Sequence, residues 1–233
     1  MATPAWRTFV VGTLLLAVAV IALARRSARL LDRQELQAVP KPALYGTLAL
    51  NQGVVLVAVA ALLVWCAVPL TTLGTGEIPD LRAVVALSVA LVLLNEAASY
   101  LTREASAANP LRALLAPRRP LDWVVLAVVL LPTIAVTEEL LFRGLLIGGL
   151  GAGTELPAGL LVVASGIGFG LAHTAQGRQG VVVALGLGLV LGAAYHLSGS
   201  LWLVVAAHYL VDLVEFLVHA APQNQSARPR RQG

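Results

Sequence analysis

The chain has 233 residues, of which 58% are apolar and 12% are charged, about half the ~25% charge of soluble domains. Three stretches, residues 42–76, 156–177 and 179–211, contain no Asp, Glu, Lys or Arg. So few charges cannot cover a soluble surface, which excludes a soluble enzyme, a nucleic-acid binder and a disordered chain. The sequence therefore predicts an all-α, polytopic membrane protein with seven to eight transmembrane helices.

Charges and helix breakers delimit seven candidate membrane spans. In chain order they are Thr8–Ala24, Leu44–Leu70, Leu81–Tyr100, Leu121–Leu150, Ala158–Gln176, Val181–Leu197 and Leu201–Ala220. The first three form an N-terminal part, residues 1–120, and the others form a core, residues 121–220. Residues 221–233 are polar and Arg-rich, and they are expected to be a disordered basic tail.

Basic residues are distributed unevenly among the connecting segments. With seven spans and an outside N-terminus, 13 of the 16 basic residues fall in segments on the inner side. This asymmetry follows the positive-inside rule and predicts a multi-pass cell-membrane protein with a cytoplasmic C-terminus. The Arg-, Ala- and Leu-rich composition favours a bacterial inner or plasma membrane. The net charge of +4 therefore reflects orientation rather than a nucleic-acid partner.

The first polar cluster inside an apolar span is Glu138, Glu139 and Arg143. Charges at the bilayer centre are costly, so they need a structural or functional reason. Glu139 and Arg143 are four residues apart and can pair on one helix face, whereas Glu138 points about 100° away. A carboxylate in low-dielectric surroundings can serve as a general base. A purely structural Glu–Arg pair explains the same residues, and the cluster alone does not decide between the two.

Two further clusters lie in later spans. His173 follows Phe169 by four residues near the end of the fifth span. In the seventh span, His208 and Asp212 lie on one helix face, so the carboxylate can fix the tautomer and orientation of the imidazole. The alternative for both clusters is a set of hydrogen-bonded polar residues lining the bundle interior.

Several other residues are expected to have structural roles. The polar pair Asn95–Glu96 in the third span is expected to hydrogen-bond across the bundle, and Glu215 continues the polar face of the seventh span. Cys66, the single cysteine, lies in an apolar run and is expected to be an inert small side chain. The GxxxG patterns Gly144/Gly148 and Gly188/Gly192 predict close helix packing.

In chain order the three clusters read Glu-Glu-x-x-x-Arg (138–143), Phe-x-x-x-His (169–173) and His-x-x-x-Asp (208–212). Their order and their placement on successive apolar segments resemble the CPBP family. This family, also called Abi, includes type II CAAX prenyl endopeptidases and bacteriocin-processing or immunity proteins. The resemblance covers about residues 121–220 and implies an all-helical intramembrane peptidase, usually with about eight membrane helices.

The resemblance implies four catalytic side chains and three that brace the site: Glu138, His173, His208 and Asp212, and then Glu139, Arg143 and Phe169. Glu138 and His173 would activate a water, while His208 and Asp212 would hold the developing oxyanion. Asp212 stands where the family motif often has Asn. An ionised carboxylate cannot donate to an oxyanion, so Asp212 either is protonated or orients His208.

Three hypotheses on function stay open at this point. The first is a cofactor-free endopeptidase acting on membrane-associated or lipid-modified peptides and proteins. The second is a zinc metallopeptidase that uses His173, His208 and Glu138 as ligands. The third is a non-catalytic membrane protein for bacteriocin immunity or partner binding. All three predict contact with membrane lipids and with a peptide or a membrane-anchored protein, and none predicts nucleic-acid binding.

The predicted spans raise one geometric difficulty. If Leu121–Leu150 is one straight helix from the inner side, Glu138 lies ~25 Å along it. His173 lies in the inner half of a helix that descends from outside, so the two side chains would miss by roughly 10 Å. We therefore expect the segment to be tilted or broken, with Pro132 as a point of kinking or interruption. The alternatives are that residues 121–131 lie in the membrane interface or re-enter, or that the segment forms two spans, which gives eight spans but reverses the C-terminal orientation.

Overall fold

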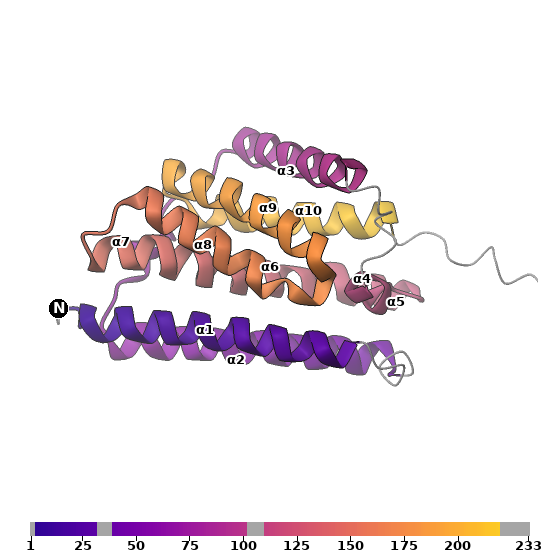
Figure 1. Ribbon diagram of the computed structural model, residues 1–233, viewed down its shortest axis with the longest axis horizontal. Coiled ribbons are helices and arrows are strands. Elements are labelled where there is room, and N and C mark those ends of the chain that lie inside the picture. The colour runs from indigo at the N-terminus through magenta and orange to yellow at the C-terminus, as the bar shows by residue number, and fades with distance from the viewer. Residues whose placement is uncertain (1–2, 32–38, 102–109, 220–233) are drawn as a thin grey trace, which may run out of the picture.

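The computed structural model describes residues 3–31, 39–101 and 110–219, and all elements within them are helical (Figure 1). Six helices are long and apolar enough to cross a membrane, and a shorter apolar helix is the seventh. They are α1 (Trp6–Leu31), α2 (Lys41–Trp65), α3 (Leu81–Leu101), a composite helix from Pro120 to Gly153, α8 (Ala158–Ala172), α9 (Gly177–Ser198) and α10 (Leu201–His219). The predicted polytopic helical fold is confirmed. The predicted tail, residues 221–233, lies outside the described residues.

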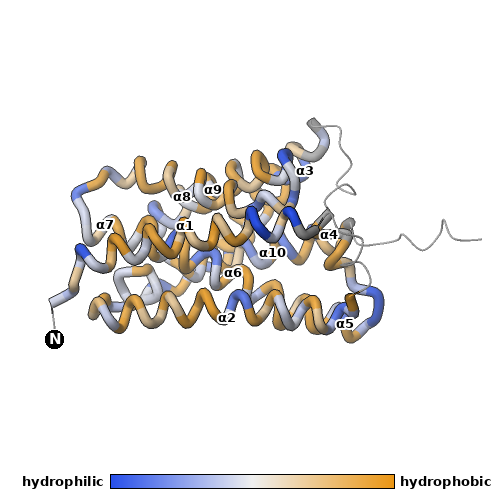
Figure 2. Tube along the Cα trace, turned by 60° about the horizontal axis from the view of Figure 1, so that its bottom comes forward, coloured by the Kyte–Doolittle hydropathy of each residue, from blue (hydrophilic) through white to orange (hydrophobic). Residues whose placement is uncertain are grey.

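The helices are arranged in layers around the composite helix and α8 (Figure 1). The pair α1 and α2 lies on one side, and α3 lies at the opposite edge, packed against α10 and α9. Large apolar side chains remain exposed on the outward faces, such as Val57, Leu93 and Val128. Figure 2 shows hydrophobic residues along the helices and hydrophilic residues gathered near α5, at one end of the bundle. This is the surface expected of a bundle in contact with lipid.

The composite helix passes through Pro132 without a break, contrary to the expected interruption. It consists of α5 (Pro120–Val125), the π-helix η4 (Leu126–Leu130), α6 (Leu131–Glu139), the π-helix η5 (Leu140–Gly149) and α7 (Leu150–Gly153). A proline ring normally clashes with the carbonyl four residues earlier. The wider turn of η4, in which the Leu131 N–H donates to Leu126 O, comes immediately before that proline. The proline is therefore accommodated by a π-turn rather than by a break.

The predicted mismatch in depth between Glu138 and His173 is absent when both depths are measured from the hairpin that joins α7 to α8. From this hairpin, residues 154–157, both Glu138 and His173 lie 15 residues away from the adjoining helix ends. Each is therefore about 20 Å below the same turn. The additional length of the composite helix lies at the other end, where α5 extends beyond α8 (Figure 1). The predicted mismatch arose because the depth of Glu138 was counted from the α5 end of the composite helix rather than from the α7–α8 hairpin.

The second span is also shorter than predicted. Helix α2 ends at Trp65 rather than at residue 70, because Ala67 adopts a left-handed conformation with φ 53°. The chain then forms the short 3-10 helix η2 (Leu70–Leu73) and turns at Gly74, where φ is 75°. The Leu201 N–H donates to Gly74 O at 2.9 Å, which anchors the start of α10. Cys66 is fully buried in this turn, as expected of an inert side chain.

Glycines bring α8 and α9 into close contact, as the GxxxG patterns predicted. A Cβ atom added at Gly188 would lie 3.2 Å from the Gly166 Cα, and one at Gly170 would lie 3.0 Å from Val181 O. Side chains at these positions would push the two helices apart. Because α8 carries His173 and α9 supplies the carbonyl of Gly188, this contact also fixes two walls of the site described next.

Candidate active site

The structure brings all four predicted catalytic side chains together from three elements. Glu138 lies on α6, His173 lies at the end of α8, and His208 and Asp212 lie one turn apart on α10. The Glu138 Oε2 atom is 3.6 Å from His173 Nε2 and 3.9 Å from His208 Nε2. This oxygen is buried and accepts no hydrogen bond from the described residues. A buried carboxylate oxygen thus faces two imidazole nitrogens from different helices.

His173 is held by the backbone of its own helix. Its Nδ1 lies 2.7 Å from the Phe169 carbonyl oxygen. A carbonyl oxygen can only accept a hydrogen bond, so Nδ1 is the protonated nitrogen. In the neutral ring, Nε2 then carries a lone pair directed toward Glu138. The final turn of α8 therefore selects one tautomer of His173.

Glu139 connects the first and third motifs. Its Oε1 accepts a hydrogen bond from Arg143 Nη1 at 2.9 Å and lies 2.7 Å from His208 Nδ1. Glu139 and Arg143 are both fully buried, and the predicted pair on one helix face is confirmed. Arg143 also donates through Nη2 to the Gly188 carbonyl of α9 at 2.9 Å. This network joins the composite helix, α9 and α10 around the site.

His208 is oriented by Glu139 rather than by Asp212, which corrects one expectation. The Nδ1 atom of His208 faces Glu139 at 2.7 Å, whereas Asp212 Oδ2 lies 3.5 Å from the opposite ring nitrogen, Nε2. The i,i+4 spacing of His208 and Asp212 on α10 placed them together but could not indicate a nearer carboxylate on another helix. Asp212 therefore lies on the same side of His208 as Glu138.

The Phe169 ring packs against the buried cation and the two imidazoles. The Arg143 guanidinium lies 4.5 Å from the ring centroid, and the His173 and His208 rings lie at 4.4 and 5.7 Å. A cation over an aromatic face is favourable, more so when water is excluded. Phe169 thus contacts the buried cation and both imidazoles of the site.

The side chains differ in how far they are exposed. Glu139 and Arg143 are fully buried, the side chain of His208 is 7% exposed, and those of Glu138 and Asp212 are 21% and 31% exposed. Exposure therefore increases from the Glu139–Arg143 pair toward Asp212. The site is closed on the bracing side and more open where Asp212 lies.

Sequence reasoning missed two contacts that shape the site. Ser165 on α8 donates to the Phe142 carbonyl at 2.7 Å, within the π-helix η5. The Gly188 carbonyl is the acceptor for Arg143, although the sequence indicated only a packing role for this residue. A buried serine and a backbone carbonyl carry no motif signal, so neither contact could be found before the helices were placed together.

Asn95 forms the hydrogen bond across the bundle that the sequence predicted. Its Nδ2 donates to Glu215 Oε2 on α10 at 2.7 Å. The zinc-site hypothesis concerns the histidines and carboxylates of the same site. Among the described residues, no group of three or more His, Cys, Asp or Glu side chains has the arrangement of a metal site.

Comparison with known families agrees with the three motifs. Residues 120–214 match the family model described as type II CAAX prenyl endopeptidase Rce1-like. The matched segment runs from the start of α5 into α10 and contains every residue of the three motifs. The resemblance to the CPBP family is therefore confirmed. No curated protein and no solved structure gives a significant match to the chain.

Proposed function

We propose that this membrane protein, whose residues 120–214 match a CAAX-type intramembrane protease family, is an endopeptidase that hydrolyses peptide bonds at a buried site. The observation that carries the proposal is the approach of two histidine Nε2 atoms to one Glu138 oxygen, at 3.6 and 3.9 Å. These groups lie within a bundle of apolar helices, where lipid makes titratable residues expensive to keep.

Glu138 and His173 are suited to activating a water. With Nδ1 of His173 donating to the Phe169 carbonyl, Nε2 of the neutral ring is an acceptor, as is an ionised Glu138. Two acceptors that face each other at 3.6 Å favour a water that donates to both. Glu138 takes one proton of this water while the oxygen attacks the carbonyl carbon of the substrate.

His208 and Asp212 supply the donor for the tetrahedral intermediate. With Nδ1 of His208 directed at Glu139, Nε2 faces Asp212 Oδ2 at 3.5 Å. A proton held on this edge, on either partner, can be donated to the oxyanion, and such donors are worth most in a dry, preorganised site. The proton on Glu138 then passes to the amine nitrogen as the C–N bond breaks. The products are a carboxylic acid and an amine, which become a carboxylate and an ammonium group by proton transfer, and Glu138 returns to its ionised form.

We propose membrane-associated or lipid-modified peptides and proteins as substrates, because the site lies among lipid-facing helices. In the orientation favoured by the positive-inside rule, the end that carries α4 (Pro110–Leu115) and α5 faces the cytoplasm. The exposed residues Arg118 and Arg119 lie at this end, next to the start of α5.

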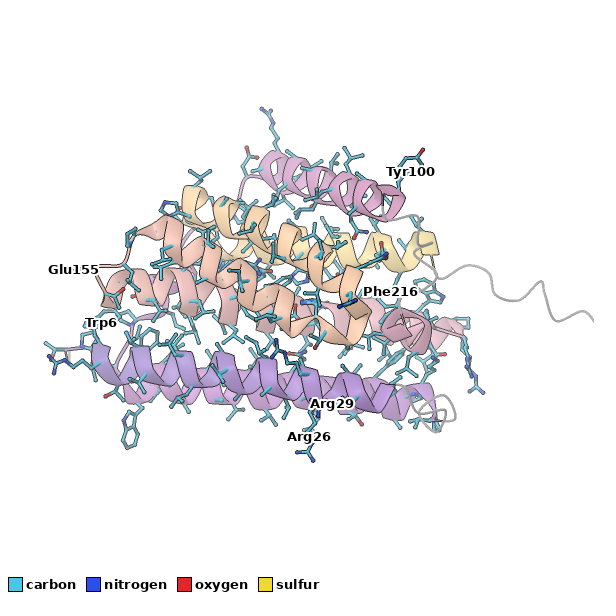
Figure 3. The ribbon with its side chains drawn as sticks, in the orientation of Figure 1. Trp6, Arg26, Arg29, Tyr100, Glu155 and Phe216 are labelled. Carbon is cyan, nitrogen blue, oxygen red and sulfur yellow. The ribbon has the colours of Figure 1, made fainter. Side chains whose placement is uncertain are left out.

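The proposal is tested by comparing protein termini in native membranes. Cells without the chain are complemented with wild type, with Glu138→Gln or with the control variant Glu155→Gln. Glu155 is exposed and lies near the α7–α8 turn, at the end of the molecule opposite Tyr100 and Phe216 (Figure 3). We expect wild type and Glu155→Gln to generate the same new termini and Glu138→Gln to generate none. Identical termini in all three complemented strains would refute hydrolysis by Glu138.

The same membranes separate the other two hypotheses. Cleavage that is lost on chelation and restored by added zinc would favour the metallopeptidase over water activation by Glu138 alone. Immunity or partner binding that persists in both Glu138→Gln and His173→Ala, without any cleaved terminus, would favour a non-catalytic protein. Cleavage that resists chelation and needs Glu138 supports the proposed endopeptidase.

A further inference from the structure

The contact between Asn95 and Glu215 has no part in the proposed reaction. It joins α3, which lies outside the family-matched segment, to the helix that carries His208 and Asp212. Both side chains are half-buried, and the hydrogen bond between them is 2.7 Å long. In Figure 1, α3 lies at the edge of the bundle along α10. A polar pair therefore occupies an interface whose outer side faces lipid.

This polar pair continues the site along α10. Glu215 is three residues beyond Asp212, so the two carboxylates share one face of the helix. Asp212 is 31% exposed, which is more than the other three proposed catalytic side chains. Polar groups therefore follow each other from Glu215 to Asp212 and on to His208 Nε2, which lies 3.5 Å from Asp212.

Asn95 marks the outer limit of the polar face and Leu91 its inner limit on α3. Asn95 lies six residues before the last residue of α3, about 9 Å along the helix. Tyr100, which is 84% exposed, and Phe216 lie at this same end of the molecule (Figure 3). One turn further into the bundle on the same side of α3, Leu91 is 1% exposed and belongs to the apolar core. Among the described residues, the polar seam thus lies about 9 Å from the end of α3 and stops where the apolar core begins.

We propose that this α3–α10 seam, formed by Asn95, Glu215 and Asp212, is the route by which water reaches Glu138. The inference rests on the proposed hydrolysis, because each cleaved bond consumes one water that a lipid-surrounded site must obtain from the aqueous phase. A partly exposed carboxylate is costly against lipid, so the open side of Asp212, which is 31% exposed, faces water. Asn95 acts as a positioning residue that holds the wall of this route.

The route is tested by the accessibility of single cysteines in native membranes. Because Cys66 is the only cysteine in the chain, Cys66→Ala gives a background without thiols. Asn95→Cys and Glu215→Cys are each treated with anionic 2-sulfonatoethyl methanethiosulfonate in permeabilised membranes. Unreacted thiols are then tagged in detergent with a polyethylene glycol maleimide and resolved on a gel. The readout requires no proteolysis, so it is independent of whether the chain is a peptidase.

The matched control is Ala97→Cys, which is exposed on the lipid side of α3 and lies nearer the end of the helix. Only a thiolate reacts, and apolar surroundings suppress ionisation, so we expect Asn95→Cys and Glu215→Cys to react at least about tenfold faster than Ala97→Cys. Equal rates at the three positions, or protection at both seam positions, would overturn the route. Fast seam labelling together with unchanged protein termini in the Glu138→Gln comparison would keep the route and reject the peptidase.

Discussion

Replacing Arg143 by Leu is the sharpest test of how the site is held together. The guanidinium is fully buried, donates to Glu139 Oε1 and to Gly188 O at 2.9 Å each, and lies 4.5 Å from the centroid of the Phe169 ring. The substitution removes all three interactions at once. It also leaves the Glu139 carboxylate buried, with His208 as its remaining hydrogen-bond partner among the described residues.

The expected loss follows from the uncompensated carboxylate. Removing one partner of a buried ion pair typically costs about 3–5 kcal/mol, more than the pair itself contributes. Arg143→Leu should therefore destabilise the bundle by about this amount. The double variant Glu139→Leu/Arg143→Leu removes the stranded charge, so its destabilisation should fall short of the sum of the single variants by about 2–3 kcal/mol.

Unfolding in mixed detergent micelles, titrated with a denaturing detergent, gives the free energies of this cycle. Arg82→Leu is the control, because Arg82 is exposed at the start of α3, and it should change stability by no more than about 0.5 kcal/mol. If Arg143→Leu behaves like Arg82→Leu, or if the double variant equals the sum of the singles, the buried network does not hold the helices as argued.

Two further substitutions probe the chemistry and the packing. Asp212→Asn places an amide donor beside His208 and should keep cleavage within about tenfold of wild type, whereas Asp212→Leu should lower it by about a hundredfold or more, measured on a substrate found in the membrane comparison. Equal losses in the two variants would exclude a donor role. Gly188→Ala would meet Gly166 Cα at 3.2 Å and should destabilise by about 1–3 kcal/mol in thermal unfolding. Gly186→Ala, with nothing within 4 Å, should stabilise by up to about 1 kcal/mol, and a reversed order would contradict the close packing of α8 and α9.

The seven spans and the three motifs could be predicted because their signals are local. Apolar runs long enough to cross a bilayer are visible in any window of the chain, and a charge inside such a run stands out. The i,i+4 spacing of Glu139 and Arg143 gave their pairing directly. That Glu138, His173 and His208 converge followed from the family resemblance, since spacing along separate helices does not fix their relative depth.

The relations between helices could not be predicted in the same way. Glu139 and Asp212 are equally plausible partners of His208 by residue type, and only the packing of α10 against α6 selects Glu139. The predicted depth of His173 relative to Glu138 depended on whether it was counted from the α5 end of the composite helix or from the α7–α8 hairpin. The π-helices η4 and η5 carry no distinct composition, so the passage through Pro132 was misjudged from proline sterics alone.

The π-turn at η4 leads to a prediction about deletions. A π-turn contains one residue more than the α-helical turn it replaces, so removing one residue there restores ordinary helix geometry. Val128 is 69% exposed, and deleting it changes the spacing of the buried residues Leu126 and Leu130 from four to three, which still keeps them on one face.

The control deletion is Leu160, which is 52% exposed on the regular helix α8. Removing it rotates either the start of α8 or the segment with Gly166 and His173 by about 100°. We expect the Val128 deletion to yield monodisperse protein in detergent, with a melting temperature lowered by the clash of Pro132 in a regular helix, and the Leu160 deletion to aggregate. The opposite order would show that the wide turn before Pro132 does not absorb an extra residue, and the continuous helix from Pro120 to Gly153 would then need another explanation.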